Sequence, residues 1–98
     1  MSTHMVIELP RVQSSQTVVR ALDIYKLRLR ASIERTQRRL NSFERHYGAT
    51  TVQFLDSMTA EDLEGGDLEY VDWAGEAKML EGLESELTEL ESARYRLP

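Results

Sequence analysis

Hydrophobic side chains recur every three or four residues through the first half of the chain, the spacing that places them on one face of an α-helix. No glycine or proline interrupts this stripe. The pattern predicts a long helix over residues 16–48 that is capped by Ser14 or Ser15 and stopped by Gly48. The stripe shifts its phase once, after Leu29. Its members are Val18, Leu22, Tyr25, Leu29, Ile33, Thr36, Leu40, Phe43 and Tyr47.

A second stripe with the same spacing predicts a return helix over residues 67–97. Asp67 is its expected N-cap, because it follows a break of two glycines. Gly75 and Gly82 weaken the helix, so we expect another backbone to approach them closely or the helix to bend there. The stripe consists of Tyr70, Trp73, Ala77, Leu80, Leu83, Leu87, Leu90 and Leu97.

Residues 49–66 join the two predicted helices and are expected to form a short helical linker. Thr50 or Thr51 caps a first short helix, since either hydroxyl can accept a hydrogen bond from a free backbone N–H. Thr59 and Asp62 form a weaker capping pattern for one more turn.

Residues 1–15 are predicted to be an extended arm. The segment 6–12 is rich in β-branched and apolar residues but contains Pro10, which removes a ladder donor. Because no other strand is predicted, the arm is expected to dock on the core or on a partner, where it could extend a sheet edge. Residues 1–4 are left out of the fold prediction, because Met5 is a candidate for the natural first residue.

The predicted fold is all-α: one domain over residues 1–98, built as a long, antiparallel, coiled-coil-like hairpin of two helices. A helix of about 32 residues spans about 48 Å, too long for a compact chain of this size. The two stripes leave a wide apolar face, which predicts a homodimer that forms a four-helix bundle. Lys26 and Thr36 near the seam would restrict its register. The residues expected to drive self-association are Leu22, Leu29, Ile33, Leu40, Leu80, Leu83, Leu87 and Leu90.

Charge divides the chain into two halves. Residues 1–48 hold nine Lys/Arg and four Asp/Glu, whereas residues 49–98 hold three Lys/Arg and thirteen Asp/Glu, for a net charge of −5. The simpler interpretation is that a basic helix lies beside an acidic one within the hairpin. The alternative is that one half meets a partner of opposite charge.

The sequence favours a protein that is not an enzyme. It has no cysteine, and its two histidines, His4 and His46, are far apart. The carboxylates around the linker could serve a hard cation such as Mg²⁺ or Ca²⁺, but their spacing does not match a calcium loop, so neither a metal ion nor another cofactor is expected. No serine stands in a strand-turn-helix elbow, and a two-helix rod offers little room for an active site. No apolar run approaches the roughly 18 residues of a membrane span, and a cytoplasmic location is expected.

Two kinds of binding are considered. Aromatic and acidic residues near the linker are candidates for binding a protein partner, although a core position is favoured for Trp73 and is as good an interpretation for Phe54 and Tyr70. Arginines on the first helix could contact nucleic-acid phosphates, but the acidic helix would compete for them. The partner-binding candidates are Phe54, Tyr70, Trp73, Asp67 and Asp72. The nucleic-acid candidates are Arg28, Arg35, Arg38 and Arg39.

Three motifs carry a resemblance to a known class of protein: Phe43-Glu44-x-x-Tyr47-Gly48, Thr51-x-x-Phe54, and Gly65-Gly66-Asp67-x-x-x-Val71-Asp72-Trp73-Ala74. In this order the chain resembles small helical antitoxins of bacterial and archaeal two-gene, type II toxin–antitoxin modules. The resemblance covers about a third of the chain. It implies a non-enzymatic protein that binds and neutralises a small cognate toxin, often one that acts on RNA. Antitoxins that repress their own operon usually carry a DNA-binding segment, and no recognisable one occurs here.

Overall fold

The computed structural model describes residues 2–96, and its longest element is the helix α1, Ser14–Tyr47. Its inward face follows an unbroken alternation of four- and three-residue steps, the repeat of a coiled-coil seam. The predicted phase shift is wrong, because Lys26 lies in the seam while Tyr25 stands beside it and is 42% exposed. The half-buried or buried seam residues are Ser15, Val19, Leu22, Lys26, Leu29, Ile33, Thr36, Leu40, Phe43 and Tyr47.

The two ends of α1 differ in how they are capped. Ser14 and Ser15 do not act as side-chain N-caps; Ser14 is already helical, and the Ser15 hydroxyl donates a hydrogen bond to the Val12 carbonyl at 2.7 Å. A backbone turn before the helix takes the place of the predicted cap. At the other end, Gly48 adopts φ +60° and its N–H bonds to the Glu44 carbonyl, the predicted stop.

The linker contains α2, Thr51–Ser57, and the 3₁₀ turn η1, Ala60–Asp62. Thr50 caps α2 through a reciprocal pair: its hydroxyl accepts from the Gln53 N–H at 3.1 Å, and its own N–H donates to the Gln53 side chain at 2.9 Å. The Thr59 N–H similarly donates to the Asp62 carboxylate at 2.8 Å. Both threonine capping patterns in the sequence are therefore confirmed.

The return helix α3 spans Gly66–Ser92, shorter than the predicted 67–97. Asp67 is not its N-cap but lies in its first turn, and Gly65 precedes the helix without a side-chain cap. Past Leu90 the side chains up to residue 96 are all exposed, so no packing supports further turns. The predicted seam residue Leu97 lies outside the described residues.

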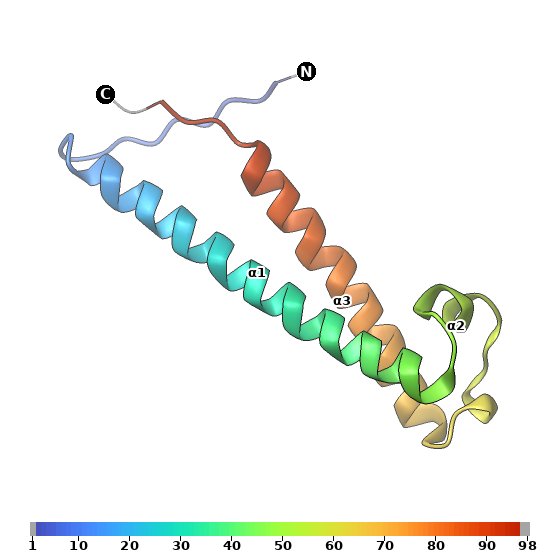
Figure 1. Ribbon diagram of the computed structural model, residues 1–98. Helices are drawn as coiled ribbons and strands as arrows, with labels where there is room; N and C mark the ends of the chain where they lie inside the picture. The colour runs from blue at the N-terminus through green and yellow to red at the C-terminus, as the bar shows by residue number, and fades with distance from the viewer. Residues whose placement is uncertain (1, 97–98) are drawn as a thin grey trace.

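The helices form an antiparallel hairpin, closed at one end by α2 and η1 (Figure 1). Near this bend α1 and α3 pack together, and towards the other end they diverge, with the extended residues on either side of the pair lying across the opening. The rod measures 59 × 27 × 18 Å. The main cluster of buried residues is at the bend and comprises Leu40, Phe54, Leu63 and Trp73.

Candidate protein-docking surface at the bend

Trp73 is the centre of the bend. Its ring stacks on Phe54 with centroids 4.0 Å apart, and Phe43 and Tyr47 lie at 5.2 and 5.7 Å. The indole N–H donates to the Thr51 hydroxyl at 3.0 Å, which satisfies its one polar group. One residue of α3 thus joins the end of α1 to α2.

The aromatic candidates for partner binding are mostly part of this core. Phe54 and Trp73 are 0% exposed, so they cannot contact a partner in this fold and the predicted surface role is corrected to a core role. Tyr70 is half-buried and packs at a tilt against Phe54, 4.9 Å between centroids. Stacking the rings inside the bend removes their apolar surface from water, which stabilises the bend.

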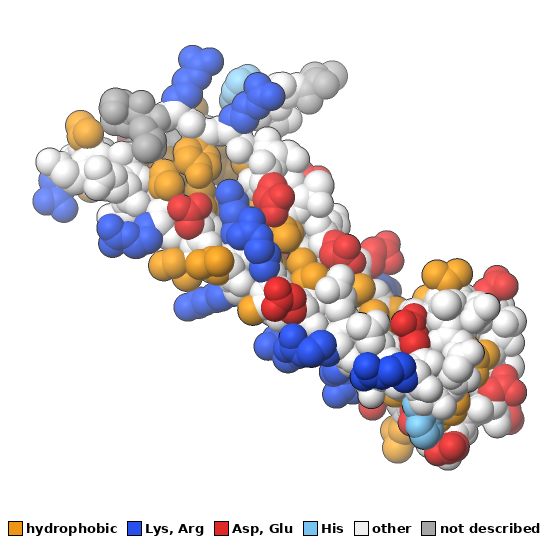
Figure 2. Space-filling view, in the orientation of Figure 1, with side chains coloured by type: hydrophobic (Ala, Val, Ile, Leu, Met, Phe, Trp, Pro, Cys, Tyr) orange, Lys and Arg blue, Asp and Glu red, His pale blue; other side chains and the backbone are white. Residues whose placement is uncertain are grey.

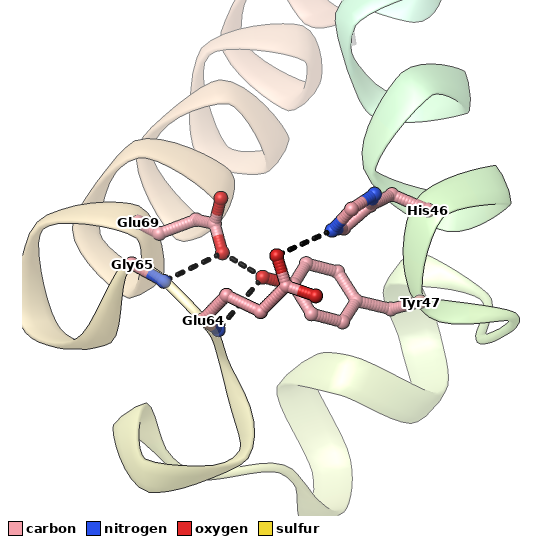
Figure 3. Close-up of polar contacts among 5 residues, drawn as sticks. All are labelled: His46, Tyr47, Glu64, Gly65 and Glu69. Carbon is pink, nitrogen blue, oxygen red and sulfur yellow. Dashed lines mark hydrogen bonds and ion pairs between the residues drawn. The ribbon is translucent and has the colours of Figure 1, made fainter.

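A polar network fixes the start of α3 to the end of α1 (Figure 3). The Tyr47 hydroxyl donates to the Glu69 carboxylate and accepts from the Glu64 N–H at 3.0 Å. Glu69 also accepts from the Gly65 N–H at 3.3 Å, which ties the residue before α3 to the first turns of the helix. His46 lies 3.1 Å from the Glu64 carboxylate at the rim. The bend is therefore held by directional bonds as well as by stacking.

Asp67 and Asp72, the acidic candidates, are both exposed on the start of α3. Between them, Leu68 and Val71 are 82% and 65% exposed and lie roughly opposite Trp73 on the helix circumference. We call these four residues the docking face. Sequence reasoning missed its two apolar members, although they begin a second stripe of three- and four-residue steps. That stripe continues through Gly75 and Met79.

The docking face belongs to a strongly acidic part of the molecule. The sequence has no Lys or Arg from His46 to Ala77. In Figure 2 most of the charged side chains around the bend are red, and blue side chains follow α1, whose last turn also carries the basic residues Arg45 and His46. The carboxylates between these limits belong to Asp56, Glu61, Asp62, Glu64, Asp67, Glu69, Asp72 and Glu76.

The charge division is partly used inside the hairpin, as the simpler interpretation predicted. Arg39 pairs with Glu76 at 2.9 Å, and Arg30 pairs with Glu91 at 3.1 Å. The Tyr25 hydroxyl donates to the Glu86 carboxylate, and this hydrogen bond raises the pKa of Tyr25 above its ordinary value of 10.0.

Of the nucleic-acid candidates, Arg39 is thus engaged with α3. Arg35 donates to the Ser32 hydroxyl of its own helix at 3.2 Å, and Arg28 and Arg38 are exposed. The four arginines therefore do not share one common environment.

The residues predicted to self-associate fall into two groups. Leu29 and Leu40 are buried within the hairpin, at 4% and 7% exposure. The other side chains are partly exposed and lie along the edge of the contact between α1 and α3. These half-buried residues are Leu22, Ile33, Leu80, Leu83, Leu87 and Leu90.

Within residues 2–96, no three His, Asp or Glu side chains are grouped closely enough to hold a metal ion. None of the helices described is both long and apolar enough to cross a membrane. Comparison of the chain with models of protein families, with curated proteins and with solved structures finds no match.

Proposed function

We propose that this chain is a non-enzymatic protein-binding module, an antitoxin that binds and neutralises a small cognate toxin through the docking face. The observation that carries the proposal is the exposure of Leu68 and Val71, 82% and 65%, between two exposed carboxylates. Large apolar side chains in a polar surround are typical of binding sites. The surrounding negative charge favours a basic partner and speeds its approach.

The helix that carries the docking face is anchored to the rest of the bend by burial and hydrogen bonds. Asp72 directly precedes Trp73, whose ring is fully buried and hydrogen-bonded. The start of α3 is also fastened by Glu69 to Tyr47. A face whose backbone is already ordered loses little conformational entropy on binding, which increases affinity.

The N-terminal arm supports the same function. Met5 and Val6 are 85% and 88% exposed, and no backbone group of residues 2–10 bonds to another backbone group within residues 2–96. An extended apolar segment with free backbone groups can add a strand to the sheet edge of a partner. The arm would then supply a second contact, remote from the docking face.

The resemblance to antitoxins gives the proposal its biological setting. A toxin that acts on RNA binds phosphates and therefore presents a basic surface. The carboxylates of the bend could occupy such a surface in place of nucleic acid. Neutralising an RNA-acting toxin places the chain in the cytoplasm.

The second candidate function is nucleic-acid binding by α1, favoured by the exposure of Arg28 and Arg38. It is weaker because Arg39 is paired with Glu76. Salt-sensitive binding of DNA or RNA by the chain alone would support it. Absence of binding at low salt would exclude it.

We also propose that two copies associate into a four-helix bundle. The half-buried residues of both stripes, such as Leu22 and Leu87, leave apolar edges along the hairpin. A second hairpin would cover these edges. This association does not use the docking face.

The test of the antitoxin proposal is co-expression of the chain with the product of the adjacent gene, followed by light scattering of the purified material. A stable complex is expected. The double variant Leu68→Ser with Val71→Ser should weaken it at least about tenfold, since two apolar anchors are lost.

The matched control is Ile24→Ser with Leu27→Ser, which changes two residues that are 43% and 62% exposed on α1. It should leave the complex intact. If the chain ignores its neighbour product, or if both double variants bind equally well, the proposal is wrong.

A further inference from the structure

Two glycines lie within α3, and no contact within residues 2–96 requires them. Gly75 and Gly82 are both exposed, and a Cβ atom added at either position meets no atom within 4 Å. Neither has a positive φ, the conformation that favours glycine. Each glycine therefore weakens the helix without serving a turn or a close contact inside the hairpin.

The two glycines are one heptad apart, on the side of α3 that carries exposed apolar side chains. At about 100° per residue, this side forms an arc of about 80° that lies roughly opposite Trp73. The large apolar members, Leu68, Val71 and Met79, are 82%, 65% and 55% exposed. We call the whole set the outer stripe; it consists of Leu68, Val71, Gly75, Met79 and Gly82.

The outer stripe has the shape that a second helix fits. Helices pack by placing the side chains of one into the gaps of the other, and the side chains at the contact set the distance between the two axes. A glycine has no Cβ, so another backbone can approach it closely. A loop that touched only Leu68 and Val71 would leave both glycines unexplained, whereas a helix lying along α3 uses the anchors and the gaps together.

Charge along α3 determines the chemistry of the helix that would cover the stripe. The element contains nine Asp and Glu residues and one basic residue, Lys78. Asp67 and Asp72 border the outer stripe on its two sides, and both are exposed. A second α3 would bring like charges together, whereas a helix with Lys and Arg on its flanks would be attracted.

We infer that the outer stripe is covered by an α-helix of the partner, amphipathic with basic flanks and closely packed against α3. This inference rests on the proposed function and adds the kind of element that the docking face binds. The contact extends beyond the docking face, from Leu68 to Gly82, over about 21 Å of α3.

The double variant Gly75→Ala with Gly82→Ala tests the close packing. Alanine favours the helix, so the melting temperature of the chain alone should rise by roughly 4–8 °C. Two added methyl groups hold the partner helix away, so the affinity for the product of the adjacent gene should fall at least about tenfold. These opposite effects separate a lost contact from a damaged fold.

The matched control is Ser85→Ala with Thr88→Ala, which also introduces two alanines at exposed positions of α3 but outside the outer stripe. It should leave the affinity unchanged. If the glycine variant binds the adjacent gene product as tightly as the native chain or more tightly, the inference is wrong.

The length of the contact is measured by alkylation of single cysteines, since the native chain has none. Met79→Cys lies on the outer stripe but beyond the docking face, and its alkylation should slow at least about tenfold in the complex, because a covered thiol does not meet the reagent. Glu81→Cys lies on the far side of the helix, at an exposed position, and should react equally fast with and without the partner.

The basic character of the partner helix is tested by Asp67→Asn with Asp72→Asn. Loss of both carboxylates should slow association at low salt at least about threefold. An unchanged association rate would overturn the basic flanks.

The remaining outcomes separate this inference from the proposed function. If Leu68→Ser with Val71→Ser weakens the complex but the partner leaves the reactivity of Met79→Cys unchanged, the docking face stands and the covering helix is wrong. Slow alkylation of Met79→Cys in the chain alone would show that a second copy covers the stripe, which also overturns the inference. Absence of any complex would overturn the proposed function and the inference together.

Discussion

The bend and the open end of this hairpin are built from the same kinds of helix but are completed in different ways. At the bend, two side chains, Phe54 and Trp73, are fully buried, α2 and η1 each have a threonine cap, and Tyr47 of α1 is hydrogen-bonded to Glu69 of α3. At the open end the helices diverge, and the arm has no backbone partner in the described chain. Stability is thus concentrated at one end, and capacity for new contacts at the other.

The largest expected effect comes from Trp73→Ala. Removing a large buried aromatic side chain should lower the free energy of unfolding by roughly 3–5 kcal/mol. Leu90 is half-buried at the open end, so Leu90→Ala should lower the free energy of unfolding by only about 1 kcal/mol. Urea denaturation followed by circular dichroism measures both, at a concentration where the chain is monomeric. Equal losses would remove the contrast between the two ends.

Thr51→Val tests whether the hydrogen bond to Trp73 contributes to the greater stability of the bend. The change leaves the Trp73 indole N–H without its acceptor in a buried site, which should cost about 1–3 kcal/mol. The matched control is Thr17→Val, an exposed position near the start of α1, where we expect a change within about 0.5 kcal/mol. A Thr51 variant as stable as the control would show that the bond contributes nothing.

Two glycine substitutions should have opposite signs. Gly48→Ala forces an L side chain into φ +60° and should destabilise the turn by about 1 kcal/mol. Gly82→Ala meets no atom within 4 Å and should stabilise α3 by up to about 1 kcal/mol. Thermal unfolding of the monomeric variants measures both. Destabilisation by Gly82→Ala would indicate a closely packed neighbour at that point of α3.

The smallest expected effect concerns Tyr25 and pH. Because the bond to Glu86 raises the pKa of Tyr25 in the folded state, its contribution to stability is present below pH 10 and is lost as pH rises through the folded pKa. Tyr25→Phe should therefore be less stable than the native chain near neutral pH, and the difference should shrink at high pH. Melting temperatures of both chains, measured from neutral to high pH, test this prediction. A difference in melting temperature that stays the same at every pH would contradict it.

Most of the fold follows from the sequence because its signals are local. Periodicity predicts both long helices, and single residues predict the stop at Gly48 and a threonine cap at residue 50 or 51, which the structure places at Thr50. The phase of α1 was misjudged between Tyr25 and Lys26, since aromatic residues are normally the better seam members. Here the lysine stem lies along the seam, and the tyrosine hydroxyl reaches Glu86.

The candidate site was harder to predict. Aromatic side chains serve both cores and interfaces, so the sequence favours a core position for Trp73 but does not decide whether Phe54 is buried. That decision depends on the path of the linker, which brings α2 onto α3. Leu68 and Val71 were overlooked because they fall outside the stronger stripe. In the structure, buried Trp73 marks the inward side of α3, and Leu68 and Val71 lie on the opposite, exposed side.

The placement of Trp73 has a practical consequence, since it is the only tryptophan in the chain. Its near-ultraviolet emission originates inside the aromatic stack and should shift to longer wavelength only when water reaches that stack. The native chain therefore carries a built-in optical reporter for one end of the rod. Loosening at the opposite end would leave this signal unchanged while the helical signal declined.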